Sequence, residues 1–159
     1  MYTRKKLPFF GLALAVLLTV VPAFSQDAQP LMIDEVLSGA RKEARASWWG
    51  YDAKDSTGNL QAAINSEVPR LIIDKLAAGP WITQPLKLVS NQEIVFEEGV
   101  EVQALRGAYK ERNDSMLNLA YVENVTLRGL GTGATLRMFK ADYHTDAYVK
   151  AEWRHGITL

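Results

Sequence analysis

The chain has 159 residues, with 18 basic and 18 acidic side chains, and it contains no cysteine. A disulfide framework is therefore excluded, and stability must come from packing. Residues 1–25 hold three of the basic side chains and none of the acidic ones, so the remainder carries 15 basic and 18 acidic side chains. That balance argues against nucleic acid as a partner, because phosphate recognition needs a basic stripe.

Residues 1–25 have the pattern of a secretory signal peptide. Three cations, Arg4 to Lys6, precede an apolar run over residues 7–21, and small residues at positions 23 and 25 suit a cleavage site. The run is short for a membrane anchor, and Pro22 interrupts it. We therefore expect a secreted protein, extracellular or periplasmic, with no membrane association after cleavage.

Two helices are predicted before the first strand. In the leader, residues 26–47, apolar residues recur at helical spacing from Leu31 to Arg45, interrupted by Gly39. The run from Asp52 to Thr57 offers N-cap side chains for a second helix that ends at Asn65. The inward residues of this second helix are expected to be Leu60, Ala63 and Ile64.

Short strands follow, each after a polar or glycine-bearing turn. Four apolar-x-apolar triplets begin at Leu71, Ile94, Val125 and Ile157, at intervals of 23, 31 and 32 residues. Short strands that recur every roughly 20–35 residues are typical of a solenoid, in which successive turns of the chain stack. We expect the four triplets to lie over one another in register.

A second strand follows two of these triplets after a glycine turn, as Val100–Val102 and again as Ala134–Leu136. Alternation in the first of them should turn Glu101 outward. An antiparallel β-sandwich also has short strands and glycine turns, and it is the alternative fold. It does not predict that turn, strand, glycine corner and strand recur in the same order.

Three segments resemble, in this order, the beginning of right-handed parallel β-helix proteins of the pectate-lyase-like superfamily. They are Trp49–Thr57 with Leu60–Asn65, Leu86–Val100 and Glu123–Gly129. The resemblance implies an all-β fold over residues 48–159, a right-handed parallel β-helix whose N-terminal end is closed by the second helix. It also implies a fragment that stops after the fourth triplet. The open edge at Ile157–Leu159 would then need further rungs or a partner chain.

The same resemblance implies a function directed at polysaccharide, by lyase or glycoside hydrolase chemistry. Catalytic residues of this superfamily usually lie on later rungs, so we expect the catalytic rungs to be absent from this chain. The alternatives are a non-catalytic glycan-binding or structural β-helix, and a small assembly module that pairs through its open edge.

Candidate catalytic residues are Arg154 and His155, with Asp142 or Asp146 as the carboxylate partner. A lone histidine before a strand is more often a turn residue that bonds to the backbone. Candidate substrate-binding residues are aromatic, since flat amphipathic rings stack on sugars. They are Tyr143, Tyr148 and Trp153, with His144 and Tyr109 beside them.

Charged residues give two further candidates. A basic strip for uronates would consist of Lys110, Arg112, Arg128, Arg137 and Lys140, unless these are ordinary outward residues. Glu97, Glu98 and Glu101 crowd one turn and would suit calcium, which takes carboxylate oxygens. A solvated acidic turn is the simpler interpretation of the same three residues, and no other cofactor is evident.

Overall fold

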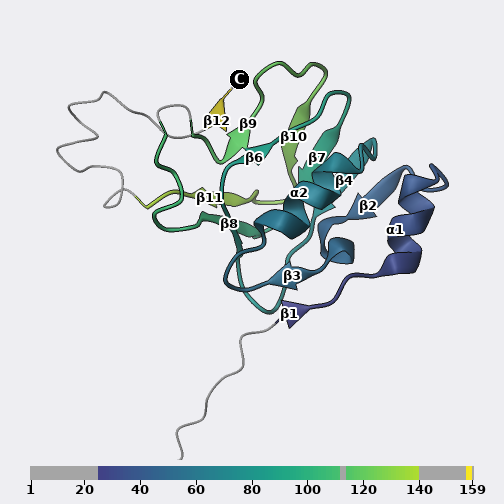
Figure 1. Ribbon diagram of the computed structural model, residues 1–159, viewed down its shortest axis with the longest axis horizontal. Coiled ribbons are helices and arrows are strands. Elements are labelled where there is room, and N and C mark those ends of the chain that lie inside the picture. Colours follow the sequence, from purple (N-terminus) through teal and green to yellow (C-terminus); the bar gives the residue numbers. More distant parts are fainter. Residues whose placement is uncertain (1–24, 112–113, 140–156, 159) are drawn as a thin grey trace, which may run out of the picture.

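The computed structural model describes residues 25–111, 114–139 and 157–158, and most of its regular structure is strands in parallel sheets (Figure 1). The predicted signal peptide lies outside the described residues except for Ser25. The helices are α1 (Pro30–Leu37), the 3-10 helix η1 (Ala46–Trp49) and α2 (Thr57–Asn65). None of the helices in the described ranges combines the length and the hydropathy of a membrane span.

Three parallel sheets make up the body of the fold. The first has the order β10-β7-β4-β2 and consists of β2 (Glu43–Arg45), β4 (Arg70–Ile73), β7 (Glu93–Phe96) and β10 (Thr126–Gly129). The second has the order β11-β8-β5 and consists of β5 (Trp81–Thr83), β8 (Glu101–Ala104) and β11 (Thr135–Arg137). The third has the order β12-β9-β6 and consists of β6 (Leu86–Lys87), β9 (Leu117–Asn118) and β12 (Ile157–Thr158). A separate antiparallel pair joins β1 (Ser25–Gln26) to β3 (Tyr51–Asp52).

The first sheet confirms part of the predicted stacking. Leu71 pairs with Ile94, and Ile94 pairs with Leu127, so the inward residues of β4, β7 and β10 form one column. Two triplets were misplaced. Val125 precedes β10, and Ile157 pairs with Leu117 in the third sheet. An apolar-x-apolar triplet has the same local pattern in every sheet, so it cannot reveal its own partner. The parallel pairing rules out the antiparallel sandwich.

The recurring second strand is confirmed. β8 pairs in parallel with both β5 and β11, as β7 does with β4 and β10. Val100 and Val102 are buried, while the intervening Glu101 is only half-buried on the outer side. The same order of strand, glycine turn and strand therefore produces the same two pairings in successive stretches of the chain.

Helix α2 lies where the sequence placed it, and its predicted inward residues Leu60, Ala63 and Ile64 are all buried. It contacts η1, β5 and β6, and Gln61 attaches it to β6 through both the N–H and the carbonyl of Lys87. The cap differs from expectation, because the Ser56 hydroxyl bonds to Asp52 instead of capping the helix.

The predicted helix from Leu31 to Arg45 is wrong in its second half. Helix α1 ends at Leu37, and Gly39 then adopts a φ of 75°, a left-handed conformation that favours glycine. Residues Glu43–Arg45 instead form β2, which pairs in parallel with β4 and places the buried Ala44 beside Leu71 in the core cluster. The leader thus supplies a strand of the first sheet.

The hydrophobic core lies between the three sheets and α2. Each sheet contributes inward side chains to one cluster, among them Leu71, Ile94, Trp81, Val102, Leu86 and Leu117. Tyr51 meets Trp81 edge to face, with ring centroids 5.3 Å apart. Their polar atoms are satisfied, since Trp81 Nε1 donates to Asp74 O at 2.8 Å and the Tyr51 hydroxyl donates to Pro80 O at 3.0 Å.

Candidate functional site

The catalytic and sugar-stacking candidates that the sequence placed between residues 140 and 156 lie outside the described residues. They are Arg154 and His155, with Asp142 and Asp146, and Tyr143, His144, Tyr148 and Trp153. Tyr109 is described, and its assignment to a groove is wrong. Its ring is fully buried, and its hydroxyl donates to Thr83 O at 2.9 Å. Tyr109 is a core residue that fixes the end of β5.

The acidic turn does not gather its carboxylates around one point. Glu97 accepts hydrogen bonds from the Lys75 N–H at 3.0 Å and from Arg45 Nη1 at 2.6 Å. Glu98 accepts from the N–H and hydroxyl of Thr132, and Glu101 pairs with Arg137. Within the described ranges, no three histidine or acidic side chains are placed to hold a metal ion. The turn therefore binds neighbouring segments of its own chain.

Glu97 has a lowered pKa. Its partial burial opposes this, but the Lys75 N–H and the Arg45 guanidinium stabilise the carboxylate and together lower the pKa. The hydrogen bond to Glu97 in turn raises the pKa of Arg45. Both groups are therefore charged across the physiological range, and the pair has no free proton-transfer role.

Ion pairs cross the outer face of the first sheet. Arg70 on β4 lies between Glu43 on β2 at 3.3 Å and Glu93 on β7 at 3.6 Å. Arg128 on β10 pairs with the other Glu93 oxygen at 3.0 Å. Charges of alternating sign thus follow one row of neighbouring residues across β2, β4 and β7, and Arg128, two positions further along β10 than the partner of Glu93, extends the ion pairs to a fourth strand. Arg128 and Arg137 belong to such pairs, so they do not form the free basic strip that the sequence suggested. Lys110 is exposed, and Arg112 and Lys140 lie outside the described residues.

Two apolar residues are buried on this outer face, which sequence reasoning missed. Ile72 and Val95 pair with each other and alternate with the inward Leu71 and Ile94, yet they are only 8% and 0% exposed. They are not members of the core cluster. Arg45 and Arg128 flank them in the same row. The consecutive apolar residues of each strand were the signal that both faces are covered.

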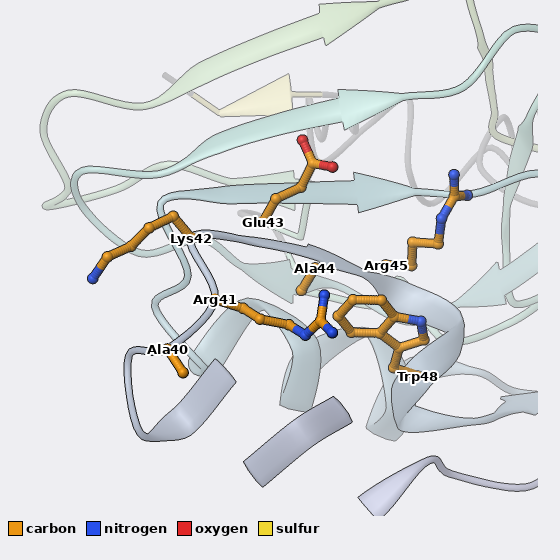
Figure 2. A pocket seen from close by; sticks show the side chains of 7 residues that line it. All are labelled: Ala40, Arg41, Lys42, Glu43, Ala44, Arg45 and Trp48. Atoms are coloured by element: carbon orange, nitrogen blue, oxygen red, sulfur yellow. The ribbon is translucent and has the colours of Figure 1, made fainter. Parts of the chain in front are cut away.

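The described residues form a pocket of about 430 Å³ at the free edge of β2 (Figure 2). Its lining consists of Ala40, Arg41, Lys42, Glu43, Ala44, Arg45 and Trp48. The Arg41 guanidinium lies over the Trp48 ring, 5.4 Å from its centroid, and its Nε pairs with Glu35 of α1. In Figure 2, Arg41 turns toward Trp48, whereas Lys42, Glu43 and Arg45 point away from this pair.

Backbone groups at the outer edge of a terminal strand border this pocket. Strand β2 is the last strand of its sheet, and Lys42 O accepts from Arg70 N on β4. The alternation of a parallel ladder therefore turns the N–H and carbonyl of Ala44 toward β4 and those of Glu43 and Arg45 toward the free edge. Sequence reasoning missed the pocket because it assigned these residues to a helix.

The pocket can bind a small anionic group. Arg41 supplies a planar set of donors, the Trp48 ring supplies an apolar face, and the edge of β2 supplies amide donors and acceptors.

Comparisons with protein-family models, with curated proteins and with solved structures each found no match.

Proposed function

We propose that the chain is part of a secreted, right-handed parallel β-helix protein directed at polysaccharide. The observation that carries the proposal is the strand order. Strands β4, β5 and β6 belong to three different sheets, and each pairs in parallel with the strand three places later, β7, β8 and β9. Strands β10, β11 and β12 repeat this order. A chain that coils once per three strands produces this pattern.

The turns support the same coiling. Asn91 and Asn124 precede β7 and β10, both have positive φ, and Asn124 Nδ2 donates to Asn91 Oδ1 at 2.9 Å. At the other end of these strands, in the turns that follow β7 and β10, Gly99 N donates to Gly133 O at 2.9 Å. Equivalent turns of successive stretches therefore lie against each other, as stacked coils require.

The polysaccharide assignment rests on the sequence resemblance and on the leader, with the strand order as its structural support. Parallel β-helices present long lateral faces, and the outer face of the first sheet offers paired acidic and basic side chains across four strands. Hydrolysis on such a face would need two suitably spaced carboxyl groups, and elimination would need a base with a cation beside it.

One observation favours non-catalytic glycan binding as the second candidate. Glu43, Glu93, Glu97 and Glu101, on or beside the strands of the first two sheets, are each ion-paired with an arginine in the described part of the chain. An ion-paired carboxylate is a poor general acid, because its partner favours the charged form.

The test uses the full chain on pectins, alginates and neutral glycans. Retention on immobilised polysaccharide measures binding, and reducing-sugar release with ultraviolet absorbance of unsaturated products measures cleavage. Retention with product formation supports the enzyme, and retention alone supports the binding module. Retention on none of the polymers would overturn both.

A further inference from the structure

The expected signal-peptide cleavage site lies in a strand of the fold. The leader pattern places the cut between Ser25 and Gln26. These two residues form β1, in which Ser25 pairs with Asp52 and Gln26 pairs with Tyr51 of β3 (Figure 1). Gln26 is exposed. Cleavage after Ser25 therefore leaves a glutamine as the first residue, at the surface of the folded chain.

The segment that begins at Gln26 is attached to the fold. Gln29 N donates to Trp48 O at 2.7 Å, and Pro30 begins α1. The Gln26 carbonyl oxygen approaches Gly50 so closely that a Cβ at Gly50 would lie 2.8 Å from it, and Gly50 has a φ of +90°. Glycine is the residue that permits both features. The carbonyl end of Gln26 is thus held in place, whereas the residue itself is exposed to solvent.

We propose that Gln26 is a modification site: it becomes the first residue of the mature chain and cyclises to pyroglutamate. The α-amino nitrogen attacks Cδ of the same side chain. A new C–N bond closes a five-membered lactam, the bond between Cδ and Nε2 breaks, and Nε2 leaves as ammonia with a proton from the amine. The step needs no other reactant. It rests on the secretion that is part of the proposed function, and it is independent of the polysaccharide assignment.

The chemistry of a terminal glutamine favours this step. An α-amino group has a pKa of about 7.7–8.0, so part of it is neutral and nucleophilic near neutral pH. The amine and the amide belong to one residue, so the reaction is intramolecular and its effective concentration is high. The exposed position of Gln26 leaves room for the ring. The lactam also removes the positive charge that cleavage creates at the start of the chain.

Mass spectrometry of the exported chain tests the proposal. The full chain is expressed with its leader in a bacterium that exports proteins, purified, and held folded at neutral pH. A synthetic peptide with the sequence of residues 26–30 is held beside it as the reference for an unhindered terminus. Intact masses and tandem spectra of the N-terminal peptide identify the first residue and its chemical state. Circular dichroism verifies that the chain stays folded.

Two variants are the controls. Gln26→Asn keeps a side-chain amide at the same position, but its side chain is one methylene shorter, so the α-amine could close only a strained four-membered ring. Gln29→Asn makes the same change at a glutamine that the cleavage does not expose as the first residue.

We expect an exported chain that begins at residue 26, is lighter than the open form by one ammonia, and has no free α-amine. The folded chain should cyclise as completely as the reference peptide. Gln26→Asn should begin at the same residue but keep its full mass and a free α-amine. Gln29→Asn should lose one ammonia, as the unsubstituted chain does.

An open Gln26 on the folded chain, after the reference peptide has cyclised, would overturn the modification and leave secretion standing. Cyclisation that starts only when the chain is unfolded in urea would overturn it in the same way. A first residue other than Gln26 would overturn the cleavage position and the modification together. An uncut chain that stays in the cell would overturn secretion as well. If the terminus is pyroglutamate but the chain is retained on no polysaccharide, this proposal holds and the polysaccharide-directed function fails.

Discussion

Arg45 on β2 reaches across β4 to bind Glu97, which follows β7. Arg45 Nη1 lies 2.6 Å from Glu97 Oε1, although the two residues are 52 positions apart. β4 lies between β2 and β7 in the sheet. This contact therefore joins the leader, which contains β2, to the turn that follows β7. The same carboxylate accepts the Lys75 N–H, so Glu97 joins three segments of the chain.

Replacing either partner should lower the free energy of unfolding. Both side chains are partly exposed, so the coupling energy between Arg45 and Glu97 in a double-mutant cycle should be about 0.5–1 kcal/mol. Glu97→Gln should cost more than Arg45→Gln, because it also weakens the bond from the Lys75 N–H. Urea unfolding measures both, with the exposed Lys42→Gln as the control. A coupling energy of zero would contradict this role.

The same pair predicts a pH dependence. The pKa of Glu97 is lower in the folded chain than in the unfolded chain, so its stabilising contribution is complete above the unfolded value, roughly 4.3. The contribution is lost as the pH falls through the folded pKa. The difference in unfolding free energy between the unsubstituted chain and Glu97→Gln should be constant near neutral pH and shrink below roughly pH 4.5. If this difference in unfolding free energy grew on acidification, the predicted direction of the pH dependence would be wrong.

Much of the fold could be predicted from local patterns, and two of the failures share one cause. Leu60, Ala63 and Ile64 face inward as their spacing indicated, because a helix that covers a core needs one apolar side. Strand β2 was missed because Ala44 continues a helical pattern, whereas its partner Leu71 lies far along the chain. Tyr109 was assigned to the surface because nothing in its local sequence reveals that it bonds to Thr83. Each error concerns a partner that is distant in the sequence.

The outer-face pair Ile72 and Val95 should matter as much as a core residue. Val95→Ala removes two methylene-sized groups from a fully buried site and should lower the free energy of unfolding by about 2 kcal/mol. Thr126→Ala, at an exposed position of β10, is the control and should change it by less than about 0.5 kcal/mol. Equal effects of the two substitutions would show that the Val95 side chain is not shielded from water on this outer face.

Substitution by alanine should change the stability of the chain in opposite directions at two glycines. A Cβ at Gly131 would lie 2.4 Å from Glu98 Cδ, and its φ is +56°. A Cβ at Gly58 in α2 would meet no atom within 4 Å, and its φ is not positive. Gly131→Ala should therefore destabilise the chain by about 1–2 kcal/mol, while Gly58→Ala should stabilise it by roughly 0.5–1 kcal/mol. Thermal melting compares them, and a neutral Gly131→Ala would contradict the packing of Glu98 against this turn.

Disulfide trapping tests the parallel stacking of the strands most directly, because the chain contains no cysteine of its own. Gln103 pairs with Arg137 in the second sheet, and Lys87 pairs with Asn118 in the third. Neighbouring residues of this kind lie roughly 5 Å apart at Cα, within disulfide range. Gln103→Cys with Arg137→Cys, and Lys87→Cys with Asn118→Cys, should each form an intramolecular disulfide under mild oxidation, whereas the cross-combination Lys87→Cys with Arg137→Cys should not. Efficient trapping of that cross-combination, with neither register pair trapped, would contradict the arrangement.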